Sequence, residues 1–300
     1  MIDETFDRDL VRAVEERWLL WAFLPFEQAY NTITSAARML DPLDRVVIDE
    51  DELREEWETA NDAIRELPEP IDNPTIKELP EKAEIKAHVE ELVQMEFFRQ
   101  SYGELRDDLY FGLIPINSVI ALQASVSISA HVDIQESLQD TLSLIKYVFP
   151  TEREQGYFTQ TIQTSNNELV GVQLTSRAPN VNVRDVRMLD GEQPMEKRVL
   201  FTVRAPPNLV NCYLHEGRVY LNNGYHRAYQ LLEAGETHLP AIIRELDEFP
   251  PDTKDMPKDV VQSDRPPLLA DFNSDAATRY RLPATNELIR ITAESTTVFR

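Results

Sequence analysis

The chain contains a single cysteine, Cys212, among its 300 residues. A lone thiol forms no intramolecular disulfide and no cysteine-based zinc site, so both kinds of cross-link are excluded. The longest apolar run, residues 18–26, is far shorter than the roughly 20 residues that a membrane-spanning helix needs. The first four residues, Met1-Ile2-Asp3-Glu4, include two acidic residues and no basic one, so they lack the basic region of a secretory signal. We therefore expect a cytoplasmic protein that does not enter a membrane.

Basic residues are also scarce, and lysine most of all. The chain has seven Lys and 23 Arg against 53 acidic residues, and its net charge is −23. A dense carboxylate surface with Arg in place of Lys is typical of proteins from a salt-adapted organism. An acidic protein of a mesophile is the alternative. Because nucleic-acid phosphates bind basic faces, a wide nucleic-acid surface is disfavoured.

Glycine is nearly absent from the first 150 residues, which contain only Gly103 and Gly112. This half is also the most acidic part of the chain, since residues 1–100 hold 26 acidic and 11 basic residues. Its apolar residues recur at spacings of three and four, which predicts amphipathic helices over 4–24, 26–40, 49–67, 81–109 and 135–148. Residues 117–130 are ambiguous, because strand-like residues lie in a helical setting. A helical bundle is the natural interpretation of this half.

The character of the chain changes after Pro150. Segments rich in Thr and Val, separated by turn residues, predict strands over 157–163, 169–174, 181–188 and 199–203. Five prolines within 249–270 indicate an extended connector or a strap over the surface. The expected fold class is α+β. It has an N-terminal all-α acidic helical domain (1–150), a small mixed α/β domain (151–248), and a Pro-rich connector with a C-terminal tail (249–300).

One stretch, residues 209–246, combines several local signals. Residues 209–213 and 218–221 predict a β-hairpin whose turn is His215-Glu216-Gly217. Residues 228–234 predict a short helix that ends at Gly235, and a buried strand follows at 239–243. The polar cluster between hairpin and helix therefore lies at a helix N-terminus, which is a favourable place for an anion.

The residue types in this cluster suit anion binding. Asn223-Gly224 permits positive φ angles, which turn successive N–H groups inward as a nest. Arg227 can close bidentately on a phosphate or carboxylate, and His226 can donate a hydrogen bond or a proton. The candidate catalytic residues are His226 and Arg227, and no metal ligands are assigned. The candidate ligand-binding residues are Glu216, Arg218, Asn222, Asn223, Gly224, Tyr225, His226 and Arg227.

Simpler structural roles remain open for the same residues. His226 could be a buried, hydrogen-bonded histidine, and Tyr225 could serve packing alone. The segment 197–244 holds six basic residues against three Glu, so it is a positive island in an acidic chain. These arginines either bind an anionic ligand or pair with the acidic helical domain.

Asn223-Gly224-Tyr225-His226-Arg227-Ala228, followed by Gly235 and by Leu239-Pro240-Ala241-Ile242-Ile243, resembles the phosphate-binding motif of the ParB/sulfiredoxin-like fold. The resemblance covers residues 209–246, and residues 1–150 lie outside it. Tyr225 stands where sulfiredoxins carry the catalytic cysteine, and Cys212 on the preceding strand does not replace it. No helix-turn-helix domain follows, unlike in chromosome-partitioning members. Neither of those two activities is therefore expected.

Other members of the family bind or hydrolyse nucleotides or phosphorylate free amino acids. The resemblance thus implies a phosphate-bearing small molecule, most simply a nucleotide with Mg²⁺, and possible reactions of phosphoryl transfer or hydrolysis. Glu216 is the nearest acidic residue to the motif. The alternative hypothesis is a non-catalytic interaction or assembly protein that binds a protein partner through its helical half.

Overall fold

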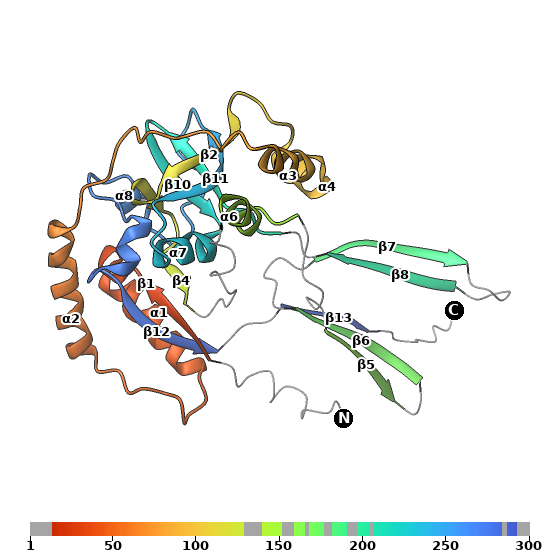
Figure 1. The fold of residues 1–300 in the computed structure, drawn as a ribbon. Coiled ribbons are helices and arrows are strands. Elements are labelled where there is room, and N and C mark those ends of the chain that lie inside the picture. The colour runs from red at the N-terminus through yellow and green to blue at the C-terminus, as the bar shows by residue number, and fades with distance from the viewer. Residues whose placement is uncertain are drawn as a thin grey trace. The chain divides into compact units, whose positions relative to one another are not determined.

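A computed structural model describes residues 14–128, 140–151, 159–165, 168–176, 182–190, 197–204, 207–283 and 287–292 (Figure 1). Its contacts divide the chain into two units. The first unit comprises Met1–Thr151 and Leu209–Ala284, and the second comprises Glu152–Asn208 and Thr285–Arg300. Residues 152–208 therefore interrupt the first unit, and they fall in a different unit from residues 209–248.

The candidate site belongs to a five-stranded sheet in the first unit. The strand order is β2 (Leu109–Pro115), β11 (His238–Glu245), β9 (Asn211–His215), β10 (Arg218–Asn223) and β3 (Val119–Ala121). The outer strand β2 runs antiparallel to β11, and the other outer strand β3 runs parallel to β10. Strands from the N-terminal half thus flank the three strands of the 209–246 segment.

A second sheet in this unit joins the two ends of the chain. Its order is β12 (Thr278–Pro283), β1 (Val14–Leu19) and β4 (Ser125–Ser127), and β1 runs antiparallel to both neighbours. Trp18 on β1 lies opposite Arg279 on β12, whose guanidinium lies 4.4 Å from the centre of the indole ring. The contact is a cation–π interaction that reinforces the register.

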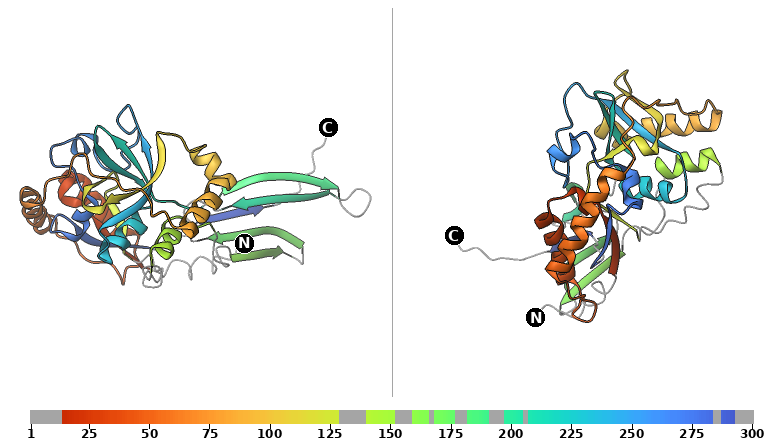
Figure 2. Two further views of the ribbon diagram at one scale, coloured as in Figure 1. Left: turned by 45° about the horizontal axis from the view of Figure 1, so that its top comes forward. Right: turned by 90° about the vertical axis from the view of Figure 1, so that its left-hand side faces the viewer.

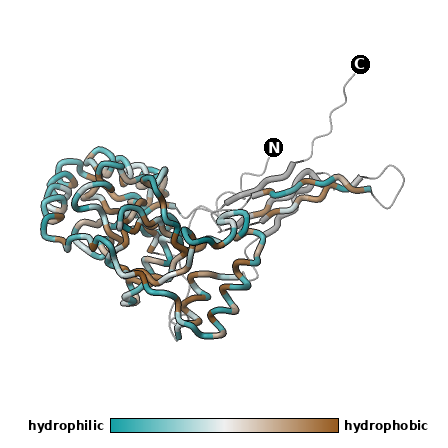
Figure 3. The backbone as a smooth tube through the Cα atoms, turned by 90° about the horizontal axis from the view of Figure 1, so that it is seen from above, coloured by the Kyte–Doolittle hydropathy of each residue, from teal (hydrophilic) through white to brown (hydrophobic). Residues whose placement is uncertain are grey.

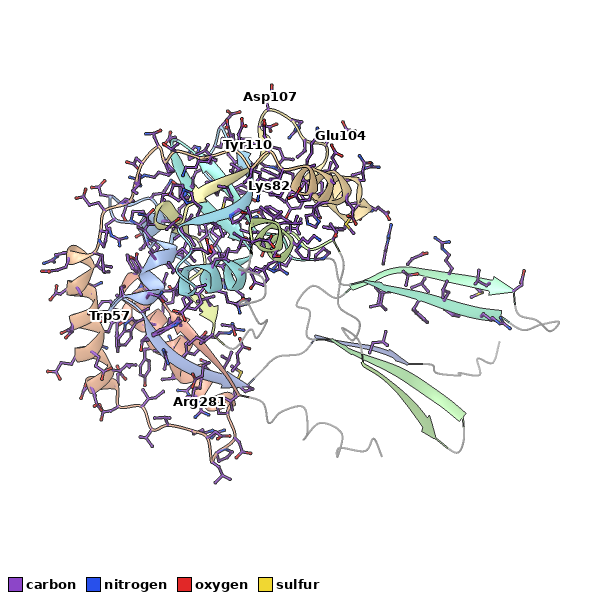
Figure 4. The ribbon with its side chains drawn as sticks, in the orientation of Figure 1. Trp57, Lys82, Glu104, Asp107, Tyr110 and Arg281 are labelled. Carbon is purple, nitrogen blue, oxygen red and sulfur yellow. The ribbon has the colours of Figure 1, made fainter. Side chains whose placement is uncertain are left out.

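Several predicted helices are present in the first unit. They are α1 (Phe26–Met39), α2 (Glu50–Ala63), α3 (Ala83–Gln94), α4 (Glu96–Tyr102) and α6 (Thr141–Val148). Asp49 caps α2 by accepting hydrogen bonds from the backbone of Asp51 and Glu52, as an N-cap carboxylate does. Helices α1 and α2 lie side by side (Figure 2), and Trp57 extends from α2 toward α1, where its ring packs against Phe26 (Figure 4).

The expected N-terminal all-α domain is wrong. Residues 14–19, predicted as part of a helix, form strand β1, and the ambiguous segment 117–130 contains β3 and β4. Residues 4–13 of that predicted helix lie outside the described residues. The helices and both sheets bury their apolar side chains in one common core, which includes Ala29, Ile85, Val219 and Ile242. The fold remains mixed α+β, because strand pairing between distant segments overrides local helical periodicity.

The Pro-rich segment packs against the first unit as a strap. Met256, Val261 and Leu268 are buried, and a short helix, α8 (Lys258–Val261), interrupts the extended chain. The backbone N–H of Ala121 donates to the carbonyl of Pro267, which ties the strap to the end of β3. The predicted C-terminal tail also supplies β12 to the first unit and β13 (Glu287–Thr292) to the second.

The second unit consists, in its described residues, of two small sheets. One has the order β13, β6 (Glu168–Ser176) and β5 (Thr159–Ser165), and the other pairs β7 (Asn182–Asp190) with β8 (Lys197–Arg204). The four strands predicted between residues 157 and 203 are therefore confirmed. The β7–β8 hairpin mixes polar and apolar residues along its length (Figure 3), and Val186, Met188 and Phe201 are exposed.

Candidate functional site

The sharp turn between β10 and the following helix, α7 (Tyr225–Glu233), requires glycine. Gly224 has φ 89° and ψ 22°, a left-handed conformation that side chains rarely adopt. A Cβ at this position would lie 2.6 Å from Cγ2 and 2.7 Å from Cα of Val210. The predicted hairpin, the Gly224 turn and the helix are all present, and the helix begins three residues earlier than expected.

The Tyr225 side chain is packed in the hydrophobic core. It is 4% exposed, and its hydroxyl accepts hydrogen bonds from the backbone N–H groups of Leu122 (2.7 Å) and Gln123 (3.0 Å). The same hydroxyl donates to the carbonyl of Leu221. Burial raises the pKa of Tyr225 well above its usual value. Tyr225 is therefore a structural member of the site rather than a residue that contacts ligand.

His226 is half-buried beside strand β4. Its Nδ1 accepts a hydrogen bond from the backbone N–H of Ser127 at 3.1 Å, so the neutral ring carries its hydrogen on Nε2. Burial lowers the pKa of His226, and the positive charges of Arg17 and Arg227 lower it further. The nearby Glu15 carboxylate opposes these effects without cancelling them. At neutral pH the ring is thus a neutral hydrogen-bond donor.

Arg227 also lies in the first turn of α7. Its guanidinium carbon is 5.9 Å from the centre of the Tyr147 ring, which belongs to helix α6. The positive charge of Arg227 counteracts the effect of burial on the pKa of Tyr147, although that pKa is still raised to about 12. Arg227 therefore brings a positive charge to the N-terminal end of α7, where an anion is stabilised.

Two charged residues of this site were missed in the sequence. Arg17 Nε donates to Glu15 Oε1 at 2.9 Å, and both residues belong to β1. Burial raises the pKa of Glu15, but the Ser127 hydroxyl and Arg17 outweigh it, so the net effect is a lowered pKa. A spacing of two places both side chains on one face of a strand. The shared face of Glu15 and Arg17 was missed because the sequence predicts this segment to be helical, and a spacing of two does not place side chains on one face of a helix.

The two asparagines before the turn have different roles. Asn222 Nδ2 donates to Asn211 Oδ1 at 2.7 Å, which links β10 to β9 beneath the turn. Asn223 is exposed, and its Oδ1 accepts the backbone N–H of Gly224 at 3.0 Å. Asn223 thus closes the turn locally through its own side chain.

Glu216 and Arg218 are at the other end of β10. Arg218 and Asn223 are five positions apart, roughly 16 Å along a strand. Arg218 Nε donates to Asp72 Oδ1 at 2.8 Å, and its other nitrogen donates to the carbonyl of Ser263. Arg218 is therefore paired with an acidic residue of the N-terminal half, as one of the alternatives anticipated. The structure does not bring these two residues to the Gly224 turn.

A cavity of about 510 Å³ lies at this opposite end. Four carboxylates contribute to its lining, those of Asp108, Glu216, Glu245 and Asp247, and none of its lining residues belongs to α7. Phosphate is repelled by such a wall. The cavity is therefore separate from the anion site predicted at the Gly224 turn.

The residues of the predicted positive island are divided between the two units. Lys197, Arg198 and Arg204 belong to β8 in the second unit, whereas Arg227 and Arg244 belong to the first. Arg244 on β11 donates to the carbonyl of Tyr102 at the end of α4. The positive charge near α7 instead comes from Arg227 and from Arg17, which is distant in sequence.

Comparison with protein-family models, curated proteins and solved structures found no match. Within the described ranges, no helix is long and apolar enough to cross a membrane. The same ranges contain no group of three His, Cys, Asp or Glu residues that could hold a metal ion.

The depressed pKa of His226 predicts a pH dependence of stability. Below about pH 6.5 the unfolded chain binds a proton at this histidine and the folded chain resists it, so the free energy of unfolding falls as pH falls. Protonation also removes the acceptor of the Ser127 N–H. In His226→Asn the amide oxygen can accept that N–H without titrating. Urea denaturation at a series of pH values around 6 measures the free energy of unfolding. That free energy should change less steeply with pH in His226→Asn than in the wild type. An equal pH dependence in the two proteins would contradict a neutral imidazole at His226.

Proposed function

We propose that this protein binds a phosphate-bearing small molecule, most simply a nucleotide, at the first turn of α7. The observation that carries the proposal is Gly224, whose left-handed backbone allows the chain to turn sharply into α7 against Val210. A helix N-terminus presents backbone N–H groups and a partial positive charge to an anion. Arg227, in the same turn, supplies the cation. The resemblance of residues 209–246 to the ParB/sulfiredoxin-like motif implies the same class of ligand.

Each side chain of the site would have a different role in binding the ligand. Arg227 would bind phosphate oxygens through its planar fork, and neutral His226 would donate from Nε2. Arg17 would add a positive charge, although Glu15 beside it offsets part of that attraction. If the ligand reacts, phosphoryl transfer or hydrolysis is the class of reaction that this arrangement favours. Arg227 would then stabilise the developing negative charge.

A titration with nucleotides tests the proposal. Calorimetry in molar potassium chloride should detect binding of ATP and ADP, with and without Mg²⁺, and should detect no comparable binding of adenosine. High salt screens exposed charge pairs, so binding that survives it reports a partly buried site. The proposal is wrong if no nucleoside phosphate binds under either condition.

The alternative hypothesis assigned a protein partner to a separate helical half. The helices α1 to α4 share one core with the strands, so the described residues provide no independent helical domain for that role. The anion-binding proposal therefore has the more specific structural support.

A further inference from the structure

The Tyr225 hydroxyl uses its full hydrogen-bonding capacity. A phenolic hydroxyl donates one hydrogen bond and accepts two. Here it donates to the carbonyl of Leu221 and accepts from the N–H groups of Leu122 and Gln123. It is buried, so water does not readily replace any of these partners. One oxygen atom therefore joins the end of β10 to the chain that leaves β3.

The same stretch of chain returns to α7 at its other end. The backbone N–H of Ser127 donates to Nδ1 of His226, the residue that follows Tyr225. Between these anchors, the N–H of Ala124 donates to the Asp255 carboxylate at 2.7 Å. Residues 122–127 comprise the three residues after β3 and the strand β4, and we term them together the β3–β4 connection. They are thus held at both ends by adjacent residues of the first turn of α7.

This arrangement makes the His226 ring depend on Tyr225. The ring keeps Nε2 as its donor only while Ser127 N–H occupies Nδ1. Ser127 ends β4, which pairs with β1 and follows closely on the residues that Tyr225 holds. We infer that Tyr225 is a positioning residue for the anion site, whose hydroxyl sets the β3–β4 connection and, through it, the orientation of His226. The inference rests on the proposed function for its ligand, but its effect on His226 is independent of any ligand.

The helix offers a matched control. Tyr229 lies one turn later on α7, is also buried, and donates its hydroxyl to Asn273 Oδ1 at 3.1 Å. Asn273 ends the 3-10 helix Leu269–Asn273, outside the β3–β4 connection. Tyr225→Phe and Tyr229→Phe thus each remove one oxygen from a buried ring of the same helix, and only the first removes an anchor of the connection.

Two measurements test the inference on the full-length protein. Tyr225→Phe should weaken ATP binding by about tenfold, the usual effect of losing one hydrogen bond, here the bond that His226 Nε2 would donate to the ligand. It should also raise the pKa of His226 toward its ordinary value, as followed by NMR of the ring protons, because burial, the largest cause of the lowered pKa, is relaxed. Glu15, Arg17 and Arg227 face His226 in both proteins and are unchanged. Tyr229→Phe should alter neither quantity.

The outcomes separate this inference from the proposed function. If the wild type does not bind ATP, the proposed function fails. The difference in the pKa of His226 between the wild type and Tyr225→Phe then still shows whether Tyr225 positions the ring. An unchanged pKa and affinity in Tyr225→Phe would overturn the inference. If that variant does not fold, the wild type decides: the amide resonances of Leu122, Gln123 and Ser127 should shift together as His226 titrates. If only the Ser127 amide resonance shifts, the Tyr225 end of the β3–β4 connection is not coupled to His226, and the inference would be wrong.

Discussion

Gly224→Ala is expected to lower the free energy of unfolding by about 2–5 kcal/mol. The left-handed backbone costs an alanine about 1–2 kcal/mol, and overpacking of a tight site costs about 1–3 kcal/mol more. The new Cβ would lie 2.7 Å from Cα of Val210, a backbone atom that cannot rotate away. Chemical denaturation of the two proteins at high salt measures the difference.

Gly235→Ala is the control for this effect. Gly235 has φ 81°, close to the value at Gly224, but no atom lies within 4 Å of where its Cβ would be. Gly235→Ala should then lower the free energy of unfolding only by the cost of the left-handed backbone, about 1–2 kcal/mol. Equal losses in the two variants would show that close packing against Val210 is not what requires glycine at the α7 turn.

Arg227→Ala is expected to weaken nucleotide binding by about 1.5–3 kcal/mol, the range of a hydrogen bond to a charged group. This corresponds to a loss of roughly ten- to a hundredfold in affinity. Arg227→Lys keeps the charge and loses the planar fork, so it should recover part of the loss. Calorimetric titration with ATP measures the affinity of the wild type, Arg227→Ala and Arg227→Lys.

Arg218→Ala is the matched control at the other end of β10. The structure pairs Arg218 with Asp72, next to an acidic cavity, and so removes it from the candidate ligand-binding residues. Its substitution should leave ATP affinity unchanged. A greater loss of affinity in Arg218→Ala than in Arg227→Ala would move the binding site to the hairpin turn and contradict the account.

The segment 209–246 could be predicted from the sequence because its signals are local. Gly217 and Gly235 both have positive φ angles at the positions where a turn and a helix end were expected. Hairpin, helix and strand each depend on neighbouring residues, which a single sequence displays directly. The strand Leu239–Ile243 is likewise buried as predicted.

The N-terminal half could not be predicted in the same way. Trp18 and Trp21 follow a helical spacing, but β1 forms because β12, more than 250 residues later, pairs with it. The strands β2 and β3 likewise depend on partners that lie beyond residue 209. Pairing across such distances leaves little trace in local periodicity.

The site shows the same limit. Glu216, Arg218 and Arg227 are close in sequence, yet a strand separates the first two from the third. Conversely, Arg17 acts on His226 although the two residues are about 200 positions apart. The identity of Tyr225 suggested a ligand contact, and only its burial and its three hydrogen bonds reveal a structural role.

The central claim is that an anion binds at the first turn of α7, and amide NMR of the full-length protein tests it most directly. Titration with ATP and, separately, with inorganic phosphate should shift the backbone amide signals of Gly224 to Ala228. The signals of Glu216, Gly217 and Arg218 should stay in place. Shifts centred on Glu216 to Arg218, or no shifts at Gly224 to Ala228 with either ligand, would contradict the account.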